Sequence, residues 1–366
     1  MNASGNCIWD SWSESEDEED IEILIIERRQ YKMHERLDHF NKWDDIDFFR
    51  RFRFRKETVA NILELIRPKL FRSRNITPMA KLLITLRFYA LGTMLISVGD
   101  FFGVCKTTVC LVVRRVSSAI ASLRKDIIKM PDSDEEMAEA SYAFYNLAKF
   151  PRTIGAIDCT HVKIQSPGGD NAEHFRNRKG YFSLNVQSVS SANLKFLNIV
   201  ARWPGSCHDQ TIFNNSVLKM KLERKDYKKY IVVADSGYSN TPYMATPLLE
   251  CTNQVEQLYN ESIIRSRNVV ERKYGVWKRR FPVLSLQMRI KTETVQDVIV
   301  ATAVLHNIAV DFNEEIPPNE LEANIPPIES FDVARIAPDN RNNVRTELLA
   351  GYFPALLQSN TSLNTS

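Results

Sequence analysis

The chain has 366 residues, 44% of them hydrophobic and 25% charged, and its formal net charge is +3 at pH 7. This length accommodates two packed units with tails, and the composition is that of an ordinary globular protein. The longest apolar stretch, residues 80–99, contains Lys81 and Arg87, and the N-terminus carries no basic-then-apolar signal segment. We therefore expect a soluble intracellular protein without a membrane span.

The six cysteines form no CxxC pair and have no histidine at zinc-ligand spacing, which favours free thiols in a reducing compartment. The charges are unevenly distributed, since residues 14–20 (ESEDEED) are acidic while residues 50–56 and 265–280 are basic. Separated blocks of this kind fit an acidic arm and a basic working surface, although each block alone fits a solvated face equally well. We expect residues 1–30 to be an acidic disordered arm.

Residues 31–140 are predicted to form an all-α region. Apolar residues recur at helical spacing over residues 45–70, and Thr77-Pro78 begins a helix that runs to about residue 91. Next, a short helix up to Phe102 meets Gly103, and a second helix begins near Lys106. This order predicts a helix-turn-helix, although an ordinary pair of packed helices has the same spacing.

On this second helix, Lys106, Arg114 and Arg115 are the residues that we expect to contact DNA. Residues 131–139 are acidic and polar and are predicted to be a link. Residues 141–312 then alternate between apolar strands and helices. We expect strands over 153–164, 181–190, 195–203 and 230–234, and helices over 210–223, 268–280 and 292–310.

The order β-β-β-α-β-α predicts an α/β domain, a mixed sheet with flanking helices. Residues 313–366 are rich in Pro, Asn and acidic side chains and are expected to be a flexible C-terminal tail. His306 falls on the apolar face of the last predicted helix, where a core position is the plain interpretation.

Asp158 is the first candidate site residue, because it lies within the apolar strand TIGAIDCTHVKI. An unpaired anion there costs several kcal/mol or shifts its pKa until it is protonated, and a metal ion removes that cost. Asp235 ends the strand YIVVAD, and Asp209 begins a predicted helix. Strand-end carboxylates of neighbouring strands in an α/β sheet can meet at one edge.

Glu271 lies in the basic helix RSRNVVERKYGVWKRRF, on one polar stripe with Arg267 and Lys278. The stripe suits a site that holds a metal ion and a polyanion together. Basic residues of the loop HFRNRKGYF, namely Arg176, Arg178 and Lys179, are further phosphate-binding candidates.

Each carboxylate also has an ordinary interpretation. Asp209 is equally suited to be a helix N-cap, Asp235 to be a turn aspartate, and Glu271 to form a surface pair with Arg267.

Four blocks in this order, IDCTH (157–161), WPGSCHD (203–209), ADSGY (234–238) and VERKYGVWKRRF (270–281), resemble those of Harbinger/PIF-type DDE transposases. The resemblance extends over about residues 48–312 and is strongest to the transposase-derived nucleases of animals. Two positions depart from the family pattern. Cys159 replaces the glycine of the usual IDGTH, and Ile264 stands where related insertion-sequence transposases have tyrosine.

The resemblance implies an RNase H-like nuclease domain with Asp158, Asp235 and Glu271 as catalytic residues. The same three would bind Mg²⁺ or Mn²⁺ together with Asp209, and a two-metal mechanism would hydrolyse phosphodiester bonds of DNA. Arg267 and Lys278 would hold flanking phosphates.

The resemblance also implies a Myb-like DNA-binding partner protein and both nuclear and cytoplasmic pools, while homo-oligomerisation stays open. The alternative function is a catalytically inactive DNA-binding or adaptor protein that retains the transposase fold.

Overall fold

The computed structural model describes residues 37–70, 76–318 and 344–363, which fall within one compact unit that spans Arg36–Ser366. The predicted acidic arm, residues 1–30, lies outside the described residues. The five cysteines of the described part of the chain are free thiols, as expected.

The helical region starts with α1 (His39–Lys42), α2 (Asp45–Phe52) and α3 (Lys56–Ile66), followed by the short 3₁₀ helix η3 (Arg67–Lys69). The helical pattern expected over residues 45–70 is therefore present, divided between α2, α3 and η3. Arg53 adopts a left-handed conformation with φ 65°, and this ends α2. The carbonyl of Arg53 accepts a 2.6 Å hydrogen bond from Arg280, so a contact from far along the chain fixes the break.

Three helices follow, α4 (Pro78–Leu91), α5 (Leu95–Phe102) and α6 (Lys106–Ala121), at the predicted boundaries. The Thr77 side chain accepts from the N–H of Ala80 and caps α4. Gly103 has φ 64°, a conformation that glycine adopts without strain. No single helix of the described chain is long and apolar enough to cross a bilayer, and α5 passes that test only together with residues 106–127, across a bend of 100°.

The link expected over residues 131–139 is largely a helix. The short α7 (Arg124–Ile127) is followed by α8 (Asp134–Ala148). Ser133 caps it by accepting from the N–H of Glu136. The acidic residues of its first turn interact favourably with the positive end of the helix dipole. The prediction of a link did not take this stabilisation of the helix into account.

The five-stranded sheet has the order β3-β2-β1-β4-β5. Its strands are β1 (Thr153–Lys163), β2 (Ser183–Ser190), β3 (Phe196–Pro204), β4 (Ile231–Val233) and β5 (Met244–Ala245). β2 is antiparallel to both β1 and β3, whereas β4 is parallel to β1 and to β5. The predicted mixed sheet is confirmed, and the two-residue β5 is an addition that the sequence did not reveal.

Helices cover both faces of the sheet. Those of this half of the chain are η4 (Ala172–Phe175), α9 (Asp209–Asn214), α10 (Val217–Glu223), α11 (Gln254–Arg280), η5 (Pro282–Leu284) and α12 (Thr292–Asp311). The helix predicted over 210–223 is two, because α9 ends at Asn214 with Asn215 as its C-cap, and Ser216 caps α10 by accepting from the N–H of Lys219. The helix predicted from residue 268 begins earlier, at Gln254, where Asn253 caps it.

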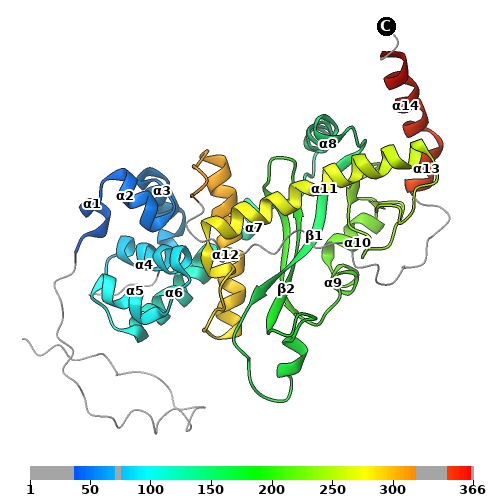
Figure 1. The fold of residues 1–366 in the computed structure, drawn as a ribbon. Coiled ribbons are helices and arrows are strands. Elements are labelled where there is room, and N and C mark those ends of the chain that lie inside the picture. The colour runs from blue at the N-terminus through cyan, green and yellow to red at the C-terminus, as the bar shows by residue number, and fades with distance from the viewer. Residues whose placement is uncertain (1–36, 71–75, 319–343, 364–366) are drawn as a thin grey trace, which may run out of the picture. The chain divides into compact units, whose positions relative to one another are not determined.

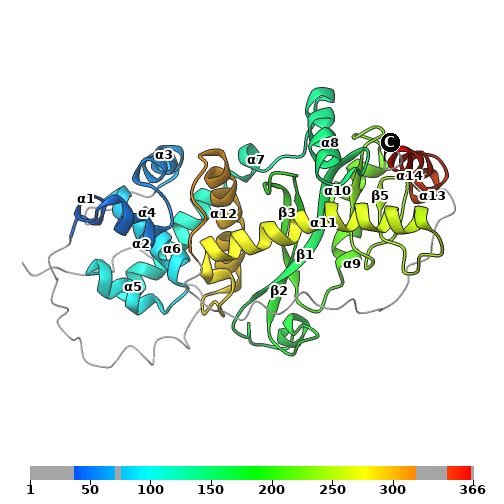
Figure 2. The ribbon, with the colours of Figure 1, turned by 45° about the horizontal axis from the view of Figure 1, so that its top comes forward.

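Two clusters of buried side chains define the faces. Ala156 and Val233 belong to the cluster that contains Trp277 of α11, while Ile157 and Val232 belong to the cluster that contains Phe213 of α9. The long helix α11 therefore crosses one face of the sheet, and α9 and α10 cover the other, as Figures 1 and 2 show.

The C-terminal segment is not a flexible tail throughout. Residues 344–363 form α13 (Val344–Ala350) and α14 (Tyr352–Leu363), while residues 319–343 lie outside the described residues. The ring of Phe353 lies 5.7 Å from that of Phe150 and 5.4 Å from that of Tyr259. Because these apolar partners come from distant parts of the chain, local composition did not predict the helices.

The helical region and the sheet share one core. The larger cluster of buried apolar side chains extends from Phe48 in α2 to Phe353 in α14. Beside α12, the buried carboxylate of Glu314 accepts from the main-chain N–H of Arg55 and from the hydroxyl of Thr58. The N-terminal helices are thus held directly to the chain that follows α12.

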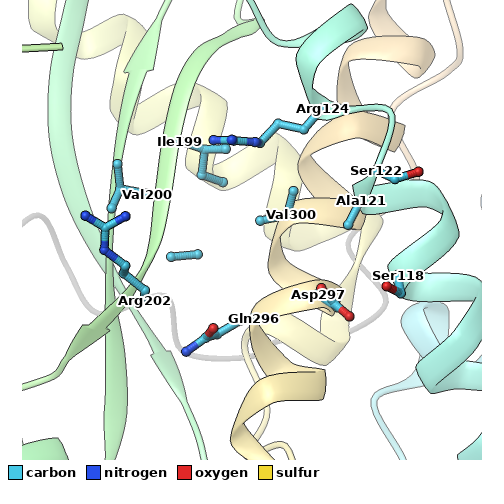
Figure 3. Close-up of a pocket in the computed structure, with 11 residues that line it drawn as sticks. Ser118, Ala121, Ser122, Arg124, Ile199, Val200, Arg202, Gln296, Asp297 and Val300 are labelled. Carbon is cyan, nitrogen blue, oxygen red and sulfur yellow. The ribbon is translucent and has the colours of Figure 1, made fainter. Parts of the chain in front are cut away.

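A pocket of about 400 Å³ lies between β3, α6 and α12 (Figure 3). Its lining includes Ser118, Arg124, Arg202 and Asp297, and none of the carboxylates predicted to be catalytic is among its lining residues.

Candidate active site

Two of the predicted carboxylates are brought together by the sheet. In the parallel ladder of β1 and β4, Ala156 is paired with Val233. Asp158 follows Ala156 by two residues within β1, and Asp235 follows Val233 by two residues, beyond the end of β4. The charge of Asp235 acts on Asp158, and the charge of Arg267 on α11 acts on both, so the two carboxyl groups lie close to each other and to α11. Both are half-buried.

The electrostatics of this pair are those of crowded anions. Burial and, after it, the charge of Asp235 raise the pKa of Asp158 to about 7, against the opposing charge of the Arg267 guanidinium. Burial likewise raises the pKa of Asp235, with Arg267 acting against it. Hydrogen bonds from main-chain N–H groups, Cys159 to Asp158 at 2.7 Å and Gly237 to Asp235 at 3.1 Å, hold the carboxylates in place.

Arg267 is the cation that faces this pair. Its side chain is buried, and its Nε has no hydrogen-bond partner within the described chain. The surface ion pair between Arg267 and Glu271, one of the ordinary interpretations, is not formed. Arg267 therefore acts on Asp158 and Asp235 through its charge.

Glu271 lies on α11, which polar contacts fix to β1. The Tyr274 hydroxyl donates a 2.8 Å hydrogen bond to the main-chain oxygen of Asp158, and Lys278 Nζ donates one of 2.8 Å to Thr160 Oγ1. Glu271 precedes Tyr274 by one helical turn. Its carboxylate is exposed and forms no hydrogen bond or ion pair with another described residue.

Asp209 is the first residue of α9. His208, not Asp209, is the N-cap residue of α9, so the N-cap interpretation is wrong. Asp209 Oδ1 accepts a 2.8 Å hydrogen bond from Asn185, and its main-chain oxygen accepts one of 3.2 Å from Gln187. The charge of Asp209 contributes to raising the pKa of both Asp158 and Asp235.

This donor set suits a divalent cation, because hard carboxylate oxygens gather where one guanidinium offsets them. Within residues 37–70, 76–318 and 344–363, however, no three His, Cys, Asp or Glu side chains are arranged to hold a metal ion. The structure thus brings Asp158 and Asp235 together and leaves Glu271 outside them.

Predicted phosphate-binding residues gather beyond the carboxylates, at the end of β1. Positive charges of Lys278, Lys179 and Arg178 contribute to lowering the pKa of His161, after the larger effect of burial. Burial, with the charges of Lys163 and Lys179, lowers the pKa of Lys278 to about 8. The cations are therefore close enough to repel one another, as expected of a surface that binds a polyanion.

The other candidate cations differ in availability. Arg178 donates a 2.6 Å hydrogen bond to His208 Nδ1, and Arg176 is paired with Glu173 at 2.7 Å. On α6, Lys106 and Arg114 are exposed and Arg115 is half-buried.

Sequence reasoning missed a polar chain under Asp158. Ser188, directly opposite Asp158 in the β1–β2 ladder, contacts both the buried Lys273 and the Tyr274 hydroxyl. The available signal was β2 itself, because its sequence SLNVQSVS alternates polar and apolar residues up to Gln187 and then places Ser188 on the face of Leu184 and Val186, although the whole strand is buried.

Comparison with known proteins agrees with this geometry. The family model of the DDE superfamily endonucleases matches residues 157–307, which contain Asp158, Asp235 and Glu271. Over residues 157–307 the chain is therefore similar to the DDE superfamily endonucleases. No solved structure was found to match the chain.

Relatives match over most of the chain. Putative nuclease HARBI1 of Bos taurus is 26% identical over 346 residues, which cover 91% of this chain and 97% of the relative, and the Homo sapiens protein gives the same values. The Arabidopsis thaliana protein named Antagonist of Like Heterochromatin Protein 1 is 26% identical over 307 residues, 75% of this chain and 76% of that protein.

The resemblance to Harbinger-type DDE transposases is thereby confirmed, together with the RNase H-like fold of the DDE endonuclease domain. The chain is an enzyme of the nuclease class.

Proposed function

We propose that this protein is a metal-dependent DNA endonuclease that hydrolyses phosphodiester bonds by a two-metal mechanism. The observation that carries the proposal is the closeness of Asp158 and Asp235, just beyond the paired residues Ala156 and Val233 of β1 and β4. Burial raises the pKa of both carboxyls, and repulsion adds to it, from Asp235 at Asp158 and from Asp209 at both. A divalent cation relieves this repulsion.

In this proposal Asp158, Asp235 and Glu271 hold Mg²⁺ or Mn²⁺, with Asp209 as an additional ligand. Such ions, when bound, acidify a water molecule and neutralise charge on the phosphate. The exposure of Glu271, and its lack of a partner in the described chain, leave its carboxylate available for this purpose. Arg267, buried behind the pair, keeps the two aspartates ionisable near neutral pH.

DNA would lie along the cations at the end of β1. Lys278, Lys179 and Arg178 bind phosphates beside the carboxylates, while Lys106 and Arg114 of α6 contact a more distant part of the duplex. The bend of 100° between α5 and the helical segment after it supports a helix-turn-helix, because helices of that motif cross at about 90–120°. The helical part, residues 31–140, then binds DNA and residues 141–312 cut it.

The test uses the full chain with duplex DNA and Mn²⁺. We expect cleavage that chelator abolishes and that Asp158→Asn and Asp235→Asn each abolish. Asp170→Asn, on an exposed loop position, is the matched control and should cleave like the unaltered chain. Cleavage by Asp158→Asn at the unaltered rate would refute the assignment.

The second candidate function is a catalytically inactive DNA-binding or adaptor protein. Two observations favour it: no three-carboxylate metal cluster exists within the described residues, and one relative is named as an antagonist of a heterochromatin protein rather than as a nuclease. Millimolar Mn²⁺ raises the thermal midpoint of a nuclease through linkage, whereas an adaptor without a metal site gains nothing. That measurement separates the two functions.

A Myb-like DNA-binding partner and a distribution between nucleus and cytoplasm belong to the same proposal. Co-purification with DNA-binding proteins of that class and imaging of the tagged full chain test them.

A further inference from the structure

Beneath Asp158 lies a chain of hydrogen bonds that starts at a fully buried lysine. Lys273 on α11 has no exposed surface, and its Nζ donates a 2.7 Å hydrogen bond to Ser188 Oγ. Ser188 Oγ lies 2.8 Å from the Tyr274 hydroxyl, which in turn lies 2.8 Å from the main-chain oxygen of Asp158.

The direction of every bond in this chain is fixed. The carbonyl of Asp158 can only accept, so the single hydroxyl proton of Tyr274 is donated to it. Tyr274 therefore has no proton left for Ser188, and the Ser188 hydroxyl must donate to Tyr274. The ammonium of Lys273 can only donate, and it completes the series. A charge at the start of such a series polarises and strengthens each later bond.

The buried position of Lys273 is unfavourable in free energy. A buried ammonium loses its hydration, and no carboxylate is within ion-pairing distance of it in the described chain. Burial lowers the pKa of Lys273 well below its ordinary value, and the charge of Asp158 opposes this shift. The Nζ of Lys273 contacts the Ser188 hydroxyl and the rings of Phe196 and Tyr274, whose centroids lie 4.1 Å and 4.6 Å away. A leucine or methionine would fill the same space without this desolvation, so packing alone does not account for a lysine.

The chain joins the elements that carry the three predicted catalytic carboxylates. Ser188 stands opposite Asp158 in the sheet, and Tyr274 follows Glu271 by one turn of α11. A bond from Tyr274 to Asp158 therefore sets how far α11 is shifted along β1, and with it where Glu271 lies relative to Asp158 and Asp235.

We propose that Lys273 is a positioning residue which, through Ser188 and Tyr274, sets the register of α11 on β1 and so the geometry of the metal-binding carboxylates. This inference rests on the proposed function. Lys273 and Tyr274 do not touch the metal or DNA, and they act through the Asp158 main chain and the placement of Glu271.

The experiment measures the Mn²⁺ dissociation constant of the full chain by calorimetry at fixed pH, together with the thermal midpoint. Tyr274→Phe removes only the hydroxyl, and Lys273→Met removes the ammonium at similar volume. Both should weaken Mn²⁺ binding by about 10- to 100-fold, as for other residues that orient metal ligands.

The chain supplies matched controls far from the site. The buried Tyr89 hydroxyl contacts Ser117 Oγ at 2.6 Å, and Lys81 is a second buried lysine. Tyr89→Phe and Lys81→Met lose a comparable buried interaction, so they should lower the thermal midpoint and keep the Mn²⁺ affinity of the unaltered chain.

The double variant Lys273→Met/Tyr274→Phe should bind Mn²⁺ only slightly more weakly than Tyr274→Phe, because both changes interrupt one chain. Folded Tyr274→Phe protein with unaltered Mn²⁺ affinity would overturn the inference, as would losses that multiply in the double variant. If Lys273→Met does not fold, Tyr274→Phe with its Tyr89→Phe control decides. Failure of the unaltered chain to bind Mn²⁺ would instead refute the proposed function itself.

Discussion

Asp158 lies two residues beyond Ala156 on β1, and Asp235 lies two residues beyond Val233, just past the end of β4, where Ala156 and Val233 are directly paired. The charges of Asp235 and of Arg267 on α11 both act on Asp158, so the two carboxylates lie close together beside α11. Because the pair is half-buried, its two charges cannot be screened fully by water, and the Arg267 guanidinium offsets them only in part. The predictions below follow from this relationship and from the buried polar groups around it.

The first prediction concerns pH and stability. The pKa of Asp158 is raised from 3.8 to about 7, so the folded chain binds more protons than the unfolded chain between these values, and metal-free stability falls as pH rises through this window. Asp158→Asn should therefore be more stable than the unaltered chain by about 2–4 kcal/mol at pH 8 in chelator. The gain should be nearly absent at pH 4. Urea unfolding at both pH values checks this, with Asp170→Asn showing no gain.

The second prediction concerns the cations at the end of β1. Lys278→Met removes one phosphate-binding charge while keeping an aliphatic side chain. We expect weaker duplex binding and a plot of log affinity against log salt whose slope is smaller in magnitude by about 1. Lys219→Met is the control, because Lys219 is paired with Glu223 on α10, away from this cluster. An unchanged salt slope for Lys278→Met would place the DNA elsewhere.

The third prediction concerns α6. Arg114 is exposed on the second helix of the bent pair, where a helix-turn-helix contacts the duplex. Arg114→Ala should lower duplex affinity by about tenfold at moderate salt, and should leave the Mn²⁺ affinity as it is. Arg67→Ala serves as comparison, since Arg67 is held by Glu64 at 2.6 Å. Equal duplex affinities for both variants would indicate an ordinary pair of packed helices.

The fourth prediction concerns acid unfolding. His306 is buried and donates from Nε2 to the Leu194 carbonyl at 2.8 Å. Burial lowers its pKa to about 3, against 6.5 when exposed, so its stabilising contribution is complete above pH 6.5 and is lost as pH falls toward 3. His306→Gln, which can keep the donor but does not titrate, should lose less stability than the unaltered chain between pH 6.5 and 4. Exposed His174→Gln should behave like the unaltered chain in the same unfolding experiment.

Local patterns accounted for much of the fold. The apolar strand runs of β1 to β4 and the helix–glycine–helix order of α5 and α6 are short-range signals, and the structure contains these elements close to the expected boundaries. The breaks at Arg53 and Ser216, the early start of α11 and the helices α13 and α14 were not predicted. Each depends on a cap or on a partner that hydrophobic periodicity does not register.

By itself the sequence determined which residue types are available and which strand or helix carries each, including the four carboxylates and the basic stripe of α11. Tertiary structure alone decided that Asp158 and Asp235 lie close together, that the charge of Arg267 acts on both, and that Lys273, Ser188 and Tyr274 form a chain of hydrogen bonds to Asp158. The contacts responsible join residues 85 and 116 positions apart in the chain, Lys273 with Ser188 and Tyr274 with Asp158. Local periodicity reports only on neighbours within a few turns, so contacts at such separations come into being only when the sheet and α11 pack together.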